Sequence, residues 1–152
     1  MPHIHKKYDF VVNAFIVCDG QILLVNHPRY HQWLSVGGHV ELDEDPEIAL
    51  YREIAEETGL RAVEILGNKP TIRSPGTKFL LMPNYLDVHE ANPPHKHICL
   101  NYFVRTKSKK IVLSHEHSEA KWFSLSELEE KQYNLSPVIV FYAQEALKAA
   151  AQ

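Results

Sequence analysis

Hydrophobic positions near the start of the chain fall into two runs rich in β-branched and aliphatic residues, residues 9–18 and 21–27. Asp19-Gly20 separates the runs, and this pair favours the tight turn of a β-hairpin. The pattern therefore predicts two antiparallel strands. Further strand candidates, bounded by loops that contain Pro or Gly, are residues 61–67, 78–82, 85–90, 97–106 and 120–124, with short strands around Trp33–Leu34 and Gly38–Glu41.

A helix is predicted over residues 46–59. Asp45 is a favourable N-cap, Pro46 suits the first helical position, and Gly59 suits the position just beyond the end. The segment between these signals is long enough for more than three helical turns. We therefore expect residues 46–59 to form a well-defined α-helix.

Two more helices are predicted near the C-terminal end, a short one over residues 124–131 and a longer one that Ser136-Pro137 opens. The alternation of strands and helices predicts an α/β fold with a mixed sheet and helices packed on its faces. A chain of 152 residues with 45% apolar residues can bury a sizeable core. We therefore expect residues 1–152 to form a single domain.

The predicted helix over residues 46–59 has two unlike faces when it is projected at 100° per residue. An arc of roughly 160° is expected to face the core; its residues are Ile48, Leu50, Tyr51, Ile54, Ala55 and Thr58. The opposite arc, of about 100°, carries Glu53, Glu56 and Glu57, with Arg52 at its border. Carboxylates crowded in this way suit a hard cation such as Mg²⁺ or Mn²⁺, although a solvated acidic surface is the common alternative.

Acidic residues are concentrated in one part of the sequence. Residues 41–57 hold eight of the chain's 19 acidic residues, with Arg52 as their only basic residue. Such a surface repels phosphate unless a cation intervenes, and no segment combines many Lys and Arg residues with aromatic ones. A nucleic-acid partner is therefore not expected.

Cysteine usage and hydropathy indicate the compartment. Cys18 and Cys99 each stand alone in an apolar context, which predicts buried free thiols in a reducing environment. The N-terminus lacks the apolar region of a secretory signal, and no apolar run is long enough to span a bilayer. We expect a cytoplasmic protein without a membrane partner.

The acidic segment follows a defined spacing. Gly38 is followed after five residues by Glu44, and after seven more by Arg52-Glu53-Ile54, then Glu56-Glu57 and Gly59-Leu60. This resembles the Nudix box, G-x5-E-x7-R-E-U-x-E-E-x-G-U, in which U is apolar, and every defined position is filled. Chance agreement at its seven fixed positions is on the order of one in a hundred million per window.

The resemblance implies a fold, a reaction and roles for residues. In the Nudix family the box lies in an α/β/α sandwich, and Glu53, Glu56 and Glu57 match carboxylates that bind a divalent metal together with the carbonyl of Gly38. Glu44 and Arg52 match residues that brace this site. The implied cofactor is Mg²⁺, with Mn²⁺ as an alternative, and the implied substrate is a small nucleoside diphosphate linked to another moiety, or another diphosphate. A homodimer is left open.

Hydrolysis of a pyrophosphate bond needs a group that takes a proton from the attacking water. Glu53 is the first choice because it lies in the middle of the acidic arc, with Glu57 as its neighbour in the box. Glu116 and Glu119 are alternatives, because some family members draw the base from a later loop. The sequence departs from the usual pattern at Val36, where proline is frequent, and at Asp43, where glycine is usual.

Substrate-binding residues are expected outside the helix. Tyr30 could stack on a base and Arg29 could pair with a phosphate, since both precede the box in a loop. His39, inside the box, could contact a substrate phosphate or be exposed. Trp33 is expected to pack in the core.

Two pairs of histidines, His95 with His97 and His115 with His117, have the spacing that puts side chains on one face of a strand. An additional structural metal is one interpretation of these pairs, and ordinary surface histidines are the other.

Two other functions fit parts of the pattern. A non-catalytic nucleotide-sensing module on the same fold commonly lacks box carboxylates, and none is missing here. The related isopentenyl diphosphate isomerase uses a cysteine just before the box region, where neither Cys18 nor Cys99 lies. A metal-dependent pyrophosphohydrolase is therefore the function that the sequence favours.

Overall fold

The computed structural model describes residues 5–152, and residues 1–4 of the predicted single domain lie outside this part. Its strands are β1 (Tyr8–Cys18), β2 (Gln21–His27), β3 (Gln32–Leu34), β4 (Val36–His39), β5 (Val63–Ile65), β6 (Tyr85–Asn92), β7 (His95–Thr106) and β8 (Glu119–Phe123). Its helices are α1 (Pro46–Thr58) and α2 (Pro137–Ala150), with short 3₁₀ helices at Glu127–Glu129 and Lys131–Tyr133.

All eight strands belong to one mixed sheet with the order β3-β2-β1-β7-β5; β4 also pairs with β1, β6 with β7, and β8 with β2. At its centre β1 and β7 run parallel, from Tyr8 beside Lys96 to Val17 beside Arg105. The predicted hairpin joins β1 to β2, and Asp19 and Gly20 both adopt the positive φ that its turn requires.

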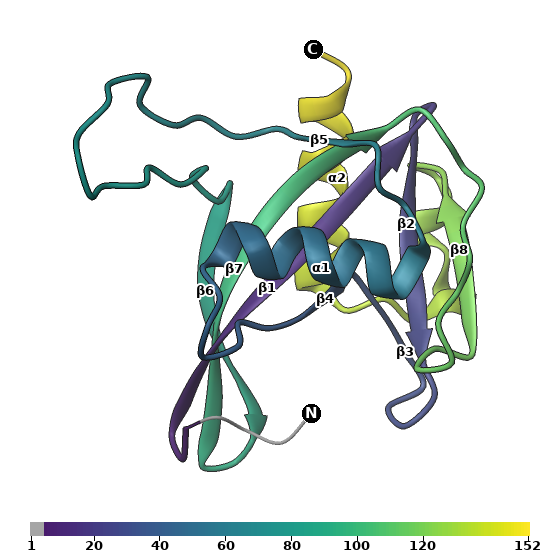
Figure 1. Ribbon diagram of the computed structural model, residues 1–152. Helices are drawn as coiled ribbons and strands as arrows, with labels where there is room; N and C mark the ends of the chain where they lie inside the picture. Colours follow the sequence, from purple (N-terminus) through teal and green to yellow (C-terminus); the bar gives the residue numbers. More distant parts are fainter. Residues whose placement is uncertain (1–4) are drawn as a thin grey trace.

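Alternation along β1 separates two hydrophobic layers. Val12, Ala14 and Ile16 pack with α1, whereas Phe15 and Val17 pack with α2 on the other face. Figure 1 shows α1 crossing in front of the sheet and α2 behind it. The predicted α/β/α sandwich with a mixed sheet is confirmed.

The signals at the ends of α1 act as predicted. The side chain of Asp45 accepts a hydrogen bond from Ile48 N–H at 3.0 Å, and Pro46 begins the helix. Gly59 adopts φ 73° and donates to the carbonyl of Ala55, which closes the last turn. The predicted range 46–59 agrees with the observed helix to within its capping residue.

Residues 78–82, predicted as a strand, form no strand. Their backbone N–H groups are used elsewhere: Leu81 donates to Glu47 Oε2 at 3.2 Å, and Met82 donates to the carbonyl of Asn68 at 2.9 Å. An apolar run becomes a strand only where a neighbouring strand accepts its hydrogen bonds. The segment instead forms one side of the long irregular excursion between β5 and β6 (Figure 1).

The helix predicted over residues 124–131 is replaced by the two 3₁₀ turns. The carboxylate of Glu127 accepts hydrogen bonds from the N–H of Ser124 at 2.8 Å and from its hydroxyl at 2.9 Å. These two bonds stabilise one tight turn rather than a longer helix. Cys18 and Cys99 are both buried free thiols, as predicted. No helix within residues 5–152 is long and apolar enough to cross a membrane.

Candidate active site

The helix α1 buries three of its carboxylates, those of Glu47, Glu53 and Glu57, and exposes two of its apolar residues. Glu53 and Glu57 are 4% and 5% exposed, whereas Ile48 and Tyr51, predicted to face the core, are 47% and 43% exposed. The predicted core arc is therefore wrong on this side of the helix. The cause lies in β4, because Gly38 leaves space for the side chain of Glu53.

Gly38 lets α1 approach the sheet this closely, and Gly37 lets β4 lie close to β1. A Cβ atom on Gly38 would lie 2.1 Å from Glu53 Oε1, and one on Gly37 would lie 2.1 Å from the carbonyl oxygen of Val12. Neither position accepts a side chain without displacing its neighbours. Gly38, the first residue of the box, thus leaves the space in which the carboxylate of Glu53 lies.

The buried carboxylates are held in different ways. Glu57 accepts the N–H of Gly37 at 3.1 Å through Oε2, and its Oε1 lies 3.1 Å from His117 Nε2. Glu53 Oε1 accepts Arg52 Nη1–H at 2.7 Å. Glu56, one turn along the same edge, has an exposed side chain. Two buried carboxylates and an exposed one therefore border the strand at Gly38.

Burial raises the pKa of Glu53 to about 7, even though Arg52 acts in the opposite direction; the charges of Glu57 and Glu56 raise this pKa further. The positive charge of Arg52 therefore does not fully offset the burial of Glu53 and the charges of its two neighbours. A divalent cation would supply further positive charge, and carboxylate and backbone carbonyl oxygens are the donors that Mg²⁺ and Mn²⁺ prefer. The donor set at α1 and Gly38 fits such an ion.

Arg52 connects the helix to the box loop. Its Nε and Nη2 hold the two carboxylate oxygens of Glu44 at 2.5 and 2.8 Å, a bidentate arrangement. Nη1 reaches Glu53 at 2.7 Å and Glu56 at 3.3 Å, and Nη2 also donates to the carbonyl of His39 at 3.0 Å. The hydrogen bond with Glu44, followed by that with Glu53, raises the pKa of Arg52, and the same bond lowers the pKa of Glu44.

Sequence reasoning did not place His117 in this site. Its loop is tied to α1 through Ser114 N–H and the carbonyl of Glu57, and to β2 through Ser118 N–H and the carbonyl of Asn26. The hydrogen bond with Glu57 raises the pKa of His117 above its ordinary value. The available signal was the histidine spacing, but spacing alone does not reveal a contact with a distant helix.

His115, the predicted partner of His117, is exposed, and so are Glu116 and Glu119. The two histidines therefore do not form a joint site. Glu119 begins β8 and is paired with Asn26 of β2, whereas Glu116 lies beside His117 in the loop.

The predicted substrate residues Arg29 and Tyr30 lie in the exposed turn between β2 and β3. The guanidinium carbon of Arg29 lies 5.7 Å from the ring centroid of Tyr30, whose ring is 4.7 Å from that of His27. His27 is in turn 6.2 Å from His117. A row of side chains thus connects this turn to Glu57. Trp33, 5.1 Å from Phe123 in ring distance, is buried as predicted.

His39 lies on the other face of the sheet. Gly38 faces α1, and consecutive residues of a strand point to opposite faces. His39 accordingly packs beside His97, with ring centroids 4.9 Å apart. Its predicted contact with substrate stays a prediction. Asp43 is not among the residues with positive φ, so the missing glycine there causes no backbone strain.

Comparison with known proteins connects this geometry to a family. The NUDIX domain matches the chain over residues 7–141, which contain the whole box and nearly all of the sheet. The chain belongs to the Nudix family. Nudix proteins typically use a divalent metal, and the carboxylates around Gly38 are the donors described above for such an ion.

Two full-length likenesses support this membership. A CTP pyrophosphohydrolase from Escherichia coli (strain K12) is 30% identical over 146 residues, which cover 92% of this chain and 93% of that protein. The crystal structure of a NUDIX-family hydrolase from Clostridium perfringens has a TM-score of 0.81 and 31% identity, covering 93% of this chain and 97% of that chain. The protein is an enzyme of the Nudix pyrophosphohydrolase family.

A third likeness is limited to part of this Nudix domain. An RNA pyrophosphohydrolase from Stenotrophomonas maltophilia (strain K279a) is 43% identical over 54 residues, which cover 34% of this chain and 26% of that protein. Higher identity over a shorter segment indicates shared local architecture more than a shared substrate.

Proposed function

We propose that this protein hydrolyses a pyrophosphate bond in a small nucleotide, either a nucleoside triphosphate or a nucleoside diphosphate linked to another moiety. The observation that carries the proposal is the burial of Glu53 and Glu57 against the glycines of β4, beside an arginine that already binds Glu44 with two hydrogen bonds. Such an arrangement costs stability, since charged groups are removed from water. Binding of a divalent ion and a phosphate explains it.

Four groups would hold the ion: the carboxylates of Glu53, Glu56 and Glu57 and the carbonyl of Gly38. Mg²⁺ or Mn²⁺, when bound there, supplies charge that offsets the phosphate oxygens and lowers the pKa of a coordinated water. Three of these groups lie on one helix, which keeps their spacing fixed. The fourth is a backbone atom of the adjoining strand.

Glu53 is the residue we assign to accept the proton of the attacking water. Its carboxylate is buried in the middle of the acidic face of α1, beside the groups that would hold the ion and its coordinated water. Glu116 and Glu119 are the alternatives, because both are exposed, Glu116 in the loop that carries His117 and Glu119 at the start of β8. Glu53→Gln, Glu116→Gln and Glu119→Gln, compared at saturating Mg²⁺, separate these assignments.

Arg52 and His117 are positioning residues in this proposal. Arg52 holds Glu53 and Glu56 from one side while Glu44 fixes its own orientation. His117 lies against Glu57 from the other side at 3.1 Å. Carboxylates that are held in place before a reaction begins need no rearrangement during it.

Arg29 and Tyr30 are the proposed contacts for the nucleotide. They are exposed, and the row of rings through His27 and His117 connects them to Glu57. An aromatic ring can stack on a base, and a guanidinium group can bind phosphate oxygens with two hydrogen bonds. A nucleotide that reaches from this turn to α1 would contact both groups.

A panel of substrates tests the proposal. CTP and dCTP come first, because a similar full-length protein is a CTP pyrophosphohydrolase. Other nucleoside triphosphates, ADP-ribose, nucleotide sugars and a short 5′-triphosphorylated RNA complete the panel. Phosphate or pyrophosphate release is measured with Mg²⁺, with Mn²⁺ and with excess chelator, and the double variant Glu53→Gln/Glu57→Gln is the inactive control.

Turnover that needs the metal and is lost in the control supports the proposal. Nucleotide binding by calorimetry without any turnover would instead favour the non-catalytic sensing module. Turnover that continues in excess chelator would contradict the proposed metal site.

A further inference from the structure

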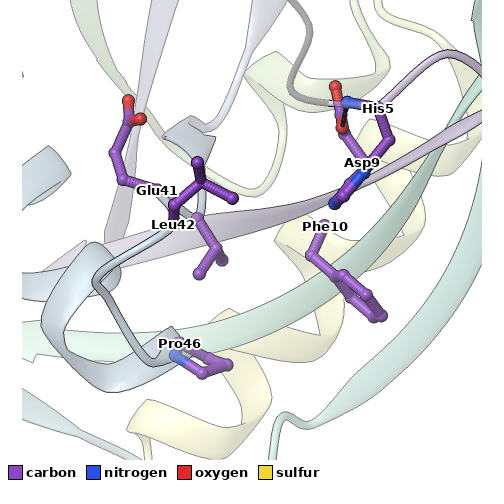
Figure 2. A pocket seen from close by; sticks show the side chains of 7 residues that line it. His5, Asp9, Phe10, Glu41, Leu42 and Pro46 are labelled. Carbon is purple, nitrogen blue, oxygen red and sulfur yellow. Dashed lines mark hydrogen bonds between the residues drawn. The ribbon is translucent and has the colours of Figure 1, made fainter.

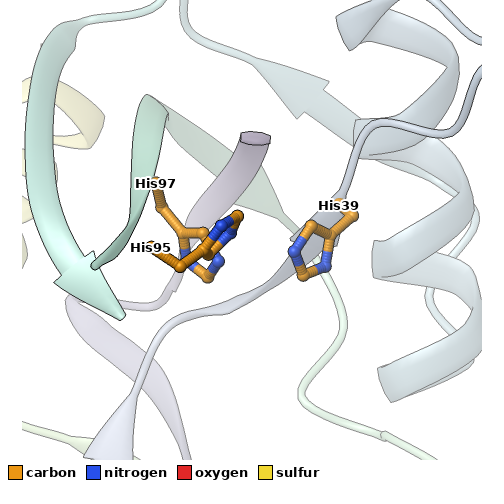
Figure 3. Close-up of side chains that lie close together, drawn as sticks. All are labelled: His39, His95 and His97. Carbon is orange, nitrogen blue, oxygen red and sulfur yellow. The ribbon is translucent and has the colours of Figure 1, made fainter. Parts of the chain in front are cut away.

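Three histidines meet on the face of the sheet opposite the carboxylates. His39 comes from the end of β4, and His95 and His97 come from the start of β7 (Figure 3). One ring nitrogen from each can be chosen so that all three atoms lie within 4.8 Å of one another. Their rings lie 4.9 Å (His39 to His97) and 5.3 Å (His95 to His97) apart by centroid. The cluster joins one predicted histidine pair to a third residue that sequence spacing did not connect with it.

Strand register explains why these side chains meet. In the sheet, His97 is paired with Asp9 of β1, and His39 is paired with Val11, two residues further along the same strand. Residues two apart on a strand point to the same face, so Asp9, His39, His95 and His97 share one face. The carboxylate of Asp9 therefore lies on the same face as the three histidines.

Asp9 lies between two of the imidazoles. Its Oδ2 is 3.2 Å from His95 Nε2 and 3.5 Å from His39 Nε2. A tetrahedral Zn²⁺ site with bonds of about 2.0–2.1 Å places neighbouring ligand atoms roughly 3.3 Å apart. These two separations already have the length of ligand–ligand edges in such a site. Asp9 and His95 are 1% and 5% exposed, so the site would be shielded from solvent.

His95 and Asp9 each have a second polar atom, and that atom is hydrogen-bonded to the backbone, as is usual for metal ligands. His95 Nδ1 lies 3.4 Å from the carbonyl of Lys6, which favours a proton on Nδ1 and leaves Nε2 with its lone pair. Asp9 Oδ1 accepts the N–H of His5 at 2.7 Å, which turns Oδ2 toward the histidines. Backbone groups outside the cluster thus orient both an imidazole and the carboxylate.

We propose that His39, His95, His97 and Asp9 bind one divalent transition-metal ion of the Zn²⁺ type in a closed, structural site. Imidazoles with one carboxylate suit Zn²⁺, Co²⁺ or Ni²⁺ and are poor ligands for Mg²⁺. Four protein ligands leave no open position for substrate. The ion would join β4, β1 and β7 at the point where the box loop leaves β4.

A neighbouring group of potential ligands fits a metal less well. Asp87, His89 and Cys99 also lie close together, but Asp87 Oδ2 already accepts Asn101 at 2.9 Å and Tyr142 at 2.6 Å. Burial raises the pKa of the Cys99 thiol to about 12, which keeps it protonated. His89 is therefore a suitable control, since its ring is 5.3 Å from that of His97 and yet it is outside the proposed site.

A depression at the surface borders the proposed site at Asp9. It has a volume of about 350 Å³, and Asp9, Phe10, Glu41 and Leu42 are among its lining residues (Figure 2). Asp9 forms part of its wall, whereas the three histidines are not among its lining residues.

The test uses Co²⁺ as a spectroscopic probe on the full chain, purified without a histidine tag and stripped of metal by chelation. His3 and His5 are both replaced by Ala in every sample, because histidines near a terminus can bind Co²⁺ on their own. Visible absorption is recorded during titration, since tetrahedral Co²⁺ absorbs far more strongly than octahedral Co²⁺. Zn²⁺ competition then gives the affinity, and X-ray absorption on the Zn²⁺ form counts nitrogen and oxygen ligands without any further variant.

We expect one Co²⁺ per chain with a tetrahedral spectrum, retained in excess Mg²⁺, in His89→Ala and in the double variant Glu53→Gln/Glu57→Gln. His95→Ala and His97→Ala should each weaken binding by roughly 100-fold or more, because loss of an outer hydrogen bond alone weakens metal sites about 10- to 100-fold. Zn²⁺ should also raise the melting temperature of the starting chain. Asp9→Asn provides a variant of nearly unchanged shape in case the histidine variants fold poorly.

Three results would overturn the proposal. The first is an octahedral spectrum that disappears in the Glu53→Gln/Glu57→Gln variant, which would assign the ion to the acidic helix. The second is equal binding in His89→Ala, His95→Ala and Asp9→Asn. The third is the absence of stoichiometric binding, which would leave Asp9 as an ordinary ion-pair partner of the histidines.

Discussion

Glu57 Oε1 lies 3.1 Å from His117 Nε2, so a carboxylate of the Nudix box contacts a side chain from the distant loop that precedes β8. Both side chains are largely buried. The contact fixes one side of the carboxylate group while Gly37 N–H fixes the other. Activity should therefore depend on a residue outside the box.

Replacing His117 by Asn removes this contact and should lower turnover by roughly 10-fold or more, the scale found for residues that orient metal ligands. Much of the loss should be recovered at high Mg²⁺ concentration, because a loosely held Glu57 binds the ion more weakly. Steady-state rates across a Mg²⁺ titration measure both effects. His115→Asn, a change at an exposed neighbour, is the matched control; equal losses in the two variants would argue against a specific role for His117.

Replacing Glu53 or Glu57 by Gln keeps the shape of the side chain and removes its negative charge. Turnover should fall by about 100-fold or more, the usual scale for loss of a general base. Circular dichroism should show an intact fold, since the burial of an uncharged group in place of a carboxylate costs less. A folded double variant that still turned over its substrate at the normal rate would show that the carboxylates are not used.

Replacing Arg52 by Lys keeps the charge and loses the planar group that holds both oxygens of Glu44 while reaching Glu53. Metal binding should weaken and turnover should slow, with partial recovery at high Mg²⁺. Rates measured at several substrate and Mg²⁺ concentrations separate this outcome from a role in substrate binding. A rise in KM that added Mg²⁺ does not reverse would mean that Arg52 contacts the substrate phosphate.

Gly38→Ala should be destabilising, because the new methyl group would lie 2.1 Å from Glu53 Oε1. Overpacking of this kind costs about 1–3 kcal/mol. The double variant Gly38→Ala/Glu53→Ala should recover part of that free energy of unfolding, since it removes the atoms that collide. Urea unfolding of both single variants and the double variant measures the coupling, and strictly additive effects would contradict the close approach.

Glu127 contributes stability that depends on pH. The hydrogen bond from Lys121 at 2.7 Å, followed by those from the N–H and hydroxyl of Ser124, lowers the pKa of Glu127 to about 2. Because the folded pKa lies below the ordinary value, this stability is present above about pH 4.5 and is lost as the pH falls toward 2. Glu127→Gln should therefore lower the urea midpoint at pH 7, with a difference that shrinks below pH 4.5. The exposed Glu90→Gln is the control, and a difference that stays constant with pH would refute the explanation.

Local signals predicted the parts of this fold that depend on neighbours in sequence. The caps at Asp45 and Gly59, the turn at Asp19-Gly20 and the glycine and carboxylate spacing of the box act over a few residues, and each was readable. The segment at residues 78–82 was misread because strand formation needs a partner, and here a side chain, Glu47, accepts a backbone hydrogen bond instead.

The candidate site was predictable where it depends on the box and not where it depends on tertiary packing. The helical projection of residues 46–59 correctly grouped the carboxylates on one arc. It assigned the apolar arc to the core, however, because hydropathy was its only guide to orientation. The absence of a side chain at Gly38 reverses that orientation in part, so Glu53 is buried and Tyr51 is exposed. His117 and the contact of His39 with His97 arise from packing between distant segments, which no periodicity in the sequence records.

The opposite orientations of Gly38 and His39 also limit how this chain can change in length. Insertion or deletion of a single residue within β4 would turn the strand over, because one step along a strand exchanges its two faces. An imidazole would then point at the carboxylates of α1, and the space for Glu53 would close. The strand should therefore accept substitutions at Val36 more readily than any change in residue number, whereas the irregular excursion between β5 and β6 should vary in length far more freely.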